Sequence, residues 1–317
     1  MPPAFMLLST AVGALLLLWM GADLLVRGAS ALALRAGISA LAVGLTVVAF
    51  GTSAPELVVS IDAARVGATD IAVGNVVGSN ICNIALILGL SALLRPTMVR
   101  AKIFRLDAPL LVVASLVVAV LLMTGGVSRG GGALFVASLL AYTAATFWQA
   151  RREGESVRAE FSEGVTGGGH RIAVDLLLII AGLAGLTAGG GLLVSSAVAL
   201  ATAFGVSQAV IGLTIVAIGT SLPELVTSLV ATARGQSDLA IGNVLGSNIF
   251  NILGILGVAA LIQPLPRGEI AWMDLAIMIL LGVVLVRMAR TGLTVSRAEG
   301  AILLVSYIGY MAWRIAA

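Results

Sequence analysis

The sequence predicts an all-α polytopic membrane protein with ten transmembrane helices in two inverted five-helix repeats. Three observations lead to this prediction. Hydrophobic residues make up 60% of the 317 residues and charged residues only 10%, and the mean hydropathy of +1.13 is far above that of a soluble domain. Apolar runs of the length that crosses a bilayer, about 20 residues, follow one another along the chain. A segment of the first half also recurs in the second half.

The apolar runs are separated by short segments in which arginine collects. We expect ten spans, at residues 4–25, 38–64, 70–94, 107–124, 131–149, 172–194, 206–232, 238–262, 271–288 and 299–316. Segments on one side of these spans contain 14 Lys and Arg residues and segments on the other side contain 4, which accounts for all 18. Because basic segments stay on the cytoplasmic side, the sequence predicts a multi-pass protein of the plasma membrane with both termini outside.

Several kinds of chemistry are excluded by single residues. One cysteine, Cys82, and one histidine, His170, cannot form a disulfide, a Cys/His metal cage or a Cys–His nucleophile. No base–nucleophile pair occurs at membrane depth, so we expect neither an enzyme nor a bound cofactor. The net charge of +3 follows from the basic cytoplasmic segments and indicates no nucleic-acid partner. The lipid bilayer is the expected surrounding; the oligomeric state is left open, and a monomer is compatible with the sequence.

The internal repeat organises the chain. Residues 37–96 align without a gap to residues 205–264 at an offset of 168 (224 − 56), and 34 of these 60 positions are identical. GTSAPELVVS and GNVVGSNICN in the first copy become GTSLPELVTS and GNVLGSNIFN in the second. Five spans per half is an odd number, so the halves must point in opposite directions. We therefore expect a first repeat at 1–149, a polar cytoplasmic linker at 150–171 and a second repeat at 172–317.

One glutamate stands at the centre of each copy. Glu56 and Glu224 fall in the middle of apolar spans, where an ionised carboxylate costs about 2.5 to 3.5 kcal/mol even on lenient insertion scales. No Lys or Arg lies at comparable depth. The sequence therefore predicts that a bound cation supplies the opposite charge.

Side chains with oxygen atoms surround each glutamate, as a hard cation requires. Thr52 and Ser53 precede Glu56 by four and three positions, on the same helix face. Pro55 removes a helix hydrogen bond, so we expect a kink or break at GTSAPE that turns backbone carbonyls toward a cavity. The next span presents three polar residues at four-residue spacing: Asn75, Ser79 and Asn83. The second copy repeats the whole set as Thr220, Ser221, Pro223, Asn243, Ser247 and Asn251.

The paired GTSxPELVxS and GNVxGSNIxN blocks resemble those of the calcium/sodium antiporters, the Na⁺/Ca²⁺ exchangers of the Ca²⁺/cation antiporter superfamily. The resemblance covers the whole chain in span number and repeat layout. It implies exchange of Na⁺ for Ca²⁺ by alternating access, with these two ions as the transported partners. It also implies a set of side-chain ligands: Thr52, Ser53, Glu56, Ser79, Asn83, Thr220, Ser221, Glu224, Ser247 and Asn251. Main-chain carbonyls near Ala49 and Ala217 are implied as well.

One position departs from the family pattern. Some exchangers carry aspartate where this chain has Asn251, so the predicted site holds two carboxylates and a charge of −2 at most, which matches one Ca²⁺. Two other functions stay open. Glu56 and Glu224 would serve as proton carriers in a Ca²⁺/H⁺ exchanger, and a passive cation channel would use the same polar residues.

Overall fold

The computed structural model describes residues 4–99, 103–161, 170–204, 217–268, 270–290 and 293–316. Helices, with η for π-helix, make up most of the first half: α1 (Ala4–Ala36), α2 (Ala40–Val43), η1 (Gly44–Val48), α3 (Ala49–Thr52), α4 (Ala54–Arg65), α5 (Thr69–Cys82), η2 (Asn83–Leu88), α6 (Gly89–Leu94), η3 (Ile103–Asp107), α7 (Ala108–Thr124) and α8 (Arg129–Phe161). The second half contains α9 (His170–Ala203), α11 (Ala217–Thr220), α12 (Leu222–Ala233), α13 (Ser237–Phe250), η5 (Asn251–Leu256), α14 (Gly257–Ile262), α15 (Trp272–Arg290) and α16 (Arg297–Ala316). Within the described residues each predicted span contains helix, which confirms the all-α fold; residues 206–216 of the seventh span lie outside them.

The helices have the length and surface of membrane spans. Among the described residues, five helices are long and apolar enough to cross a bilayer, or six if the bent pair Ala40–Thr52 and Ala54–Arg65 is one span. α7 and α12 are apolar but shorter. Large apolar side chains such as Phe5, Leu140 and Ile180 are more than half exposed, an arrangement that suits contact with lipid.

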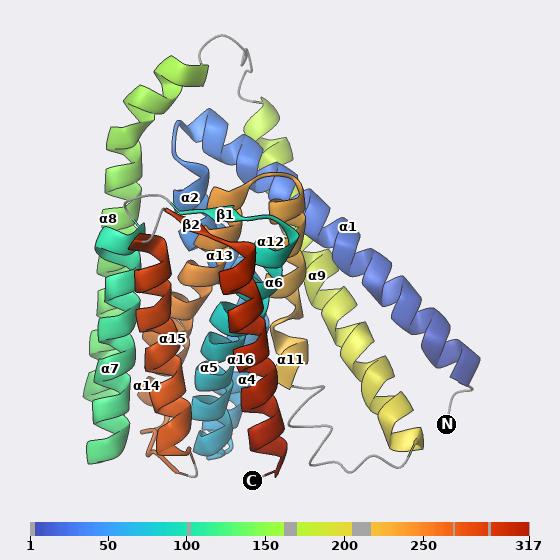
Figure 1. Ribbon diagram of the computed structural model, residues 1–317, viewed down its shortest axis with the longest axis vertical. Helices are drawn as coiled ribbons and strands as arrows, with labels where there is room; N and C mark the ends of the chain where they lie inside the picture. The colour runs from blue at the N-terminus through green and yellow to red at the C-terminus, as the bar shows by residue number, and fades with distance from the viewer. Residues whose placement is uncertain are drawn as a thin grey trace.

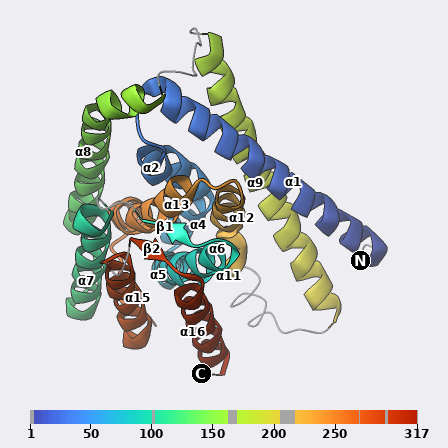
Figure 2. The ribbon, with the colours of Figure 1, turned by 45° about the horizontal axis from the view of Figure 1, so that its top comes forward.

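Two continuous helical rods form the centre of the molecule. Of their most apolar stretches, 78% is buried in the rod α5–η2–α6 and 83% in the rod α13–η5–α14. α7, α8, α15 and α16 stand around them, whereas α1 and α9 run side by side along one flank (Figures 1 and 2). A Cβ atom on Gly21 of α1 would lie 2.8 Å from the carbonyl oxygen of Gly182 on α9. The two backbones of this flanking pair therefore touch.

The two predicted helix breaks are present, each two residues before its proline. Ser53 (φ −84°, ψ 9°) separates α3 from α4, and the two segments are bent by 47°. Ser221 (φ −87°, ψ 8°) separates α11 from α12 in the same way. Pro55 and Pro223 each stand in the first turn of the following helix, where the missing N–H is harmless and the fixed φ is favourable.

Short β contacts show the symmetry of the two halves. β1 (Thr97–Met98) pairs antiparallel with β2 (Thr294–Val295), with Thr97 opposite Val295. A second bridge joins Val127 to Leu265. Adding the repeat offset of 168 converts Thr97 to position 265 and Val127 to position 295. The two contacts therefore join equivalent positions of the two repeats.

The ends of some helices extend beyond the predicted spans. α1 continues to Ala36 rather than ending at residue 25, because the charged residues in its last turns have partners: Arg27 pairs with Asp23 (2.9 Å) and Arg35 with Asp175 of α9. α8 reaches Phe161 and α9 begins at His170, so helix enters the predicted linker from both ends. Residues 162–169 of that linker lie outside the described residues.

Candidate ion-binding site

The two helix breaks meet at the centre of the molecule and exchange side chains. Ser53, at the first break, donates a hydrogen bond to Glu224 Oε1 (2.7 Å). Ser221, at the second break, donates one to Glu56 Oε1 (3.2 Å). Each glutamate thus uses the serine of the other repeat. Helical spacing had placed Ser53 beside Glu56, but the break at Ser53 redirects its side chain across the repeat interface.

Both glutamates are buried, and each lies in the first turn of a helix. Glu56 and Glu224 are each 1% exposed and stand in the first turn of α4 and α12. Unpaired N–H groups and the helix dipole stabilise an anion at that end of a helix. None of the ion pairs seen among the described residues includes either glutamate. Their Oε2 atoms also have no hydrogen-bond partner there.

Two asparagines hold the breaks in place. Asn75 on α5 donates from Nδ2 to the carbonyl oxygen of Glu56 (3.0 Å) and to Ser60 Oγ (2.9 Å). In the second copy Asn243 on α13 donates to the carbonyl oxygen of Glu224 (3.3 Å) and to Ser228 Oγ (3.0 Å). The serines one turn after each glutamate are therefore engaged by asparagine instead of by the carboxylate.

The central rods bring further oxygen atoms to the same region. Ser79, Asn83, Ser247 and Asn251 are all buried, with at most 3% of each exposed. Ser79 Oγ lies 3.4 Å from Ser221 Oγ. The described residues offer no hydrogen-bond partner to Asn83 Oδ1, Ser247 Oγ or Asn251 Oδ1. A buried polar atom without a partner costs about 1 to 3 kcal/mol. We therefore expect a cation to bind these oxygen atoms.

The remaining predicted ligands have varied positions. Thr52 donates to Asn243 Oδ1 (3.1 Å) and lies 3.4 Å from the carbonyl oxygen of Ala49, which also accepts the N–H of Ser53 (3.1 Å). Thr220 ends α11 and is partly exposed to a cavity. Ala217 is the first described residue of α11. The structure thus gathers the predicted residues at the two breaks and on the two rods, although several hydroxyls also bind one another.

Within the part of the chain that the structure describes, no third acidic residue joins Glu56 and Glu224 in a metal-binding group. Among the described residues no three of His, Cys, Asp and Glu come close enough to hold a metal ion together. This agrees with a site of two carboxylates that relies on neutral oxygens for its other ligands.

Comparison with known proteins identifies the family. A family model described as sodium/calcium exchanger protein matches residues 6–148 and 174–316. The chain belongs to the sodium/calcium exchanger family. It is 39% identical over 306 residues to the putative antiporter CaxA of Alkalimonas amylolytica, covering 94% of this chain and 95% of CaxA. It is also 39% identical over 320 residues to the inner membrane protein YrbG of Escherichia coli, covering 97% of both.

The fold comparison agrees with the family. A solved structure of the sodium-calcium exchanger NCX_Mj, soaked with Na⁺ and Ca²⁺, superposes with a TM-score of 0.84 at 32% identity and covers 97% of this chain and 98% of that one. The resemblance noted in the motif blocks is confirmed. This exchanger-family chain is therefore a multi-pass membrane transporter whose activity is cation exchange of the Ca²⁺ class.

Two features of the exchanger's site were missed by the sequence analysis. Asn80 accepts a hydrogen bond from Asn251 Nδ2 (3.0 Å) and donates one to the carbonyl oxygen of Asn248 (3.3 Å), which ties the two rods together. The available signal was that GSN, with Asn80 and Asn248, occurs in both copies of the repeat. The rods also change to π-helix at Asn83 and Asn251. Such π segments are frequent at functional sites, but no residue pattern announces them.

Proposed function

We propose that this exchanger moves Ca²⁺ out across the plasma membrane in return for Na⁺, with both ions competing for one site between the repeats. The observation that supports this most directly is the pair Glu56 and Glu224. Each is 1% exposed, has no ion-pair partner among the described residues and keeps one carboxylate oxygen without a hydrogen bond. A hard cation supplies the missing charge and binds those oxygens.

The proposed ligands fall into three groups by what they offer an ion. Glu56 and Glu224 provide charge. Neutral side-chain oxygens come from both repeats: Thr52, Ser53, Ser79, Asn83, Thr220, Ser221, Ser247 and Asn251. Main-chain carbonyls of Ala49 and Ala217 complete the set; the Ala49 oxygen accepts the N–H of Ser53 at 3.1 Å and lies 3.4 Å from the Thr52 hydroxyl, which can turn to Asn243 Oδ1 when an ion binds.

The charge of the site bears on the stoichiometry. Two carboxylates balance one Ca²⁺ or two Na⁺, and a third Na⁺ would bind to neutral oxygens alone. We propose that three Na⁺ or more are exchanged for each Ca²⁺, which moves net charge. Each extra charge is worth about 2.3 kcal/mol per 100 mV of membrane potential, roughly a fiftyfold change in the final Ca²⁺ gradient.

A potential clamp tests the stoichiometry. Proteoliposomes are clamped with K⁺ and valinomycin at two potentials while Na⁺-driven Ca²⁺ flux is followed. A final Ca²⁺ gradient that does not depend on potential would establish electroneutral exchange and remove the third Na⁺.

The proposed orientation places both termini outside the cell. In the structure the start of α1 and the end of α16 lie toward one end of the molecule, and the end of α8 and the start of α9 lie at the opposite end (Figure 1). The excess of Lys and Arg on the side where α8 ends and α9 begins favours a cytoplasmic location for that side. The relative YrbG is named an inner membrane protein, which supports a location in the plasma membrane.

The coupling ion is tested by substitution of external cations. Vesicles loaded with Na⁺ are diluted into choline or Na⁺ medium containing Ca²⁺, with and without a pH gradient. We expect Ca²⁺ uptake that requires an outward Na⁺ gradient and saturates. Uptake that follows the pH gradient with choline on both sides would instead identify a Ca²⁺/H⁺ exchanger, and uptake without counterflow would identify a channel.

A further inference from the structure

Two cavities flank the ion site, and they are copies of each other in the two repeats. The Phe250 cavity, about 910 Å³, lies between the α2–α4 segment, α8, α9 and α13. The Cys82 cavity, about 340 Å³, lies between α4, α5, α11 and α16. Their walls match at the offset of 168: Gly246, Phe250 and Tyr142 in the first correspond to Gly78, Cys82 and Tyr310 in the second.

The matching tyrosines confirm that the two walls are built alike. Tyr142 donates a hydrogen bond to Asp107 Oδ1, and Tyr310 donates one to Asp274 Oδ1, both at 3.0 Å. A difference between the two cavities therefore arises from particular side chains and from packing, on a common architecture.

The Cys82 cavity reaches the ion site. Its wall includes Ser79 and Thr220, which are proposed ligands, and Asn75, which holds the first break. The repeat counterparts Ser247, Thr52 and Asn243 are at most 1% exposed and do not belong to the described wall of the Phe250 cavity. That wall ends at their chain neighbours, Gly246 and Gly51.

An aromatic pair lines the Phe250 cavity. The rings of Phe50 and Phe250 meet edge to face, with centroids 5.0 Å apart and planes at 70°. Phe50 is 57% exposed, whereas Phe250 is 7% exposed and directly precedes Asn251. In the other cavity the position of Phe250 is taken by the much smaller Cys82.

Backbone packing also closes the side of Phe250. On the side of Phe250, a Cβ atom on Gly242 would lie 2.9 Å from the carbonyl oxygen of Leu41, and one on Gly246 would lie 2.6 Å from that of Leu45. Their counterparts Gly74 and Gly78 line the Cys82 cavity. The glycine pair on the side of Phe250 is thus packed against a neighbouring backbone; the positions equivalent to Leu41 and Leu45 in the second repeat lie outside the described residues.

We propose that Phe50 and Phe250 form an aromatic barrier that separates the Phe250 cavity from the ion site, so that ions enter this conformation from the Cys82 cavity. The inference rests on the proposed location of the ion site, though not on which ion is exchanged. Opening toward the Phe250 cavity requires the two rings to separate. Phe50 and Phe250 are then the residues that decide to which side the site is open.

Thiol labelling tests the barrier without the need for transport. Cys82 is the only cysteine of the chain, so Cys82→Ser gives a background without thiols, and Ser247→Cys adds a probe next to the barrier. A membrane-impermeant cationic methanethiosulfonate is applied to right-side-out and inverted membrane vesicles in the absence of Na⁺ and Ca²⁺. Labelling of Val59→Cys in the same thiol-free background marks the vesicles that expose the Cys82 cavity, because Val59 lines that cavity and is 37% exposed; the other vesicles expose the Phe250 cavity.

Phe250→Ala should raise the labelling rate at position 247 from the Phe250 side by about an order of magnitude or more, because a covered thiol reacts only in the molecules whose cover is open. Phe147→Ala is the matched control, since Phe147 is an aromatic residue of the same cavity outside the ring pair. It should leave the rate unchanged. Phe250→Leu, which keeps apolar bulk without a ring, should act in the same direction as Phe250→Ala and serves if the alanine variant does not fold.

An unchanged rate with both Phe250 variants would overturn the barrier. An equal rise with Phe147→Ala would overturn it too, because general loosening would then explain the result. Ca²⁺ flux through the parent is measured separately. The labelling pattern without Na⁺-dependent Ca²⁺ flux through the parent would refute the proposed function and leave the barrier intact.

Discussion

The two sides of the ion site are built from the same motif but differ in exposure. Asn75 and Thr220, which face the Cys82 cavity, are half-buried, whereas their counterparts Asn243 and Thr52 on the side of the Phe250 cavity are 0% and 1% exposed. Identical residues thus stand in two environments. An inverted repeat lets the chain place one copy in an open packing and the other in a closed one, which is what a transporter needs to expose its site to one side at a time.

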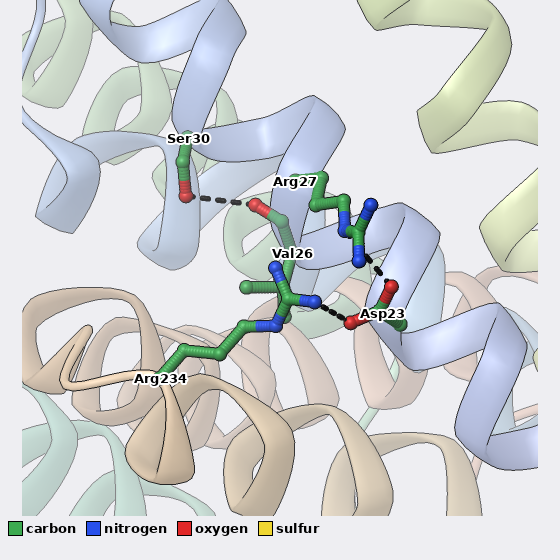
Figure 3. Close-up of polar contacts among 5 residues, drawn as sticks. All are labelled: Asp23, Val26, Arg27, Ser30 and Arg234. Atoms are coloured by element: carbon green, nitrogen blue, oxygen red, sulfur yellow. Dashed lines mark hydrogen bonds and ion pairs between the residues drawn. The ribbon is translucent and has the colours of Figure 1, made fainter.

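Charged side chains strengthen the closed side. In the second half of α1, Asp23 pairs with Arg27 (2.9 Å) and with Arg234 at the end of α12, and Ser30 donates a hydrogen bond to the carbonyl oxygen of Val26 (2.7 Å; Figure 3). The repeat counterparts of Asp23 and Arg234 are Gly191 and Val66, which cannot pair. The flanking helix α1 is therefore tied to the core by a polar contact that has no equivalent on the open side.

The largest effect is expected from the carboxylates, which belong to opposite repeats but should be equally necessary. Glu56→Gln and Glu224→Gln should each lower Ca²⁺ flux about a hundredfold or more, because one carboxylate leaves a buried divalent ion uncompensated. Asp62→Asn, which removes an exposed carboxylate from the same helix as Glu56, is the control and should behave as the parent. The Ca²⁺ flux of each variant is measured in proteoliposomes. Normal flux in only one glutamate variant would show that the two halves of the site are not equivalent.

The exchanged serines should produce the next largest effect. Ser53→Ala and Ser221→Ala each remove a hydroxyl that one repeat donates to the glutamate of the other, and hydrogen bonds to charged groups contribute about 1.5 to 3 kcal/mol. We expect the apparent Ca²⁺ affinity to fall about tenfold or more. The larger loss should come from Ser53, whose contact is shorter (2.7 against 3.2 Å). Ser115→Ala, a buried hydroxyl bonded within its own helix, controls for packing, and an equal loss there would contradict the assignment.

An added carboxylate tests whether Asn251 and its repeat equivalent Asn83 face the ion. Asn251 donates to Asn80 (3.0 Å), so Asn251→Asp loses this bond while it adds a third carboxylate. Like charges in one site favour protonation of one of them. Transport by Asn251→Asp should therefore decline at a higher pH than transport by the parent on acidification. Asn83→Asp adds the same charge at the repeat-equivalent position. Flux against pH that is identical in parent and both variants would show that neither side chain faces the ion.

The smallest effect is expected from the polar contact on α1. Asp23→Asn weakens a partly exposed ion pair worth about 1 kcal/mol or less, which loosens the closed side. The labelling rate of Val59→Cys in the Cys82→Ser background should fall, by at most about fivefold, as molecules shift to the opposite packing, and added salt should reduce the difference. The control is Asp62→Asn, which breaks the exposed ion pair of Asp62 with Arg65 (3.5 Å) on α4. It should leave the labelling rate unchanged. A faster rate in Asp23→Asn would reverse the proposed direction.

Much of this architecture follows from local features of the chain. The apolar runs require a bilayer, and an odd number of spans per repeat requires inversion. Pro55 and Pro223 lack an N–H, so breaks at Ser53 and Ser221 were predictable from the sequence. A glutamate in the middle of each apolar span, with no basic residue at that depth, predicted where a cation would be needed. These inferences need no knowledge of which helices touch.

Other features depend on contacts between residues far apart in the sequence. Ser53 binds Glu224 rather than Glu56, and Asn251 binds Asn80 of the other rod. The sequence alone determined that two near-identical motifs flank one central site, a symmetric arrangement. Only the tertiary structure decided that the side of Phe250 is closed and the side of Cys82 is open, because a repeated motif is compatible with both packings, and the choice is made by long-range contacts such as Phe50 with Phe250 and Asp23 with Arg234.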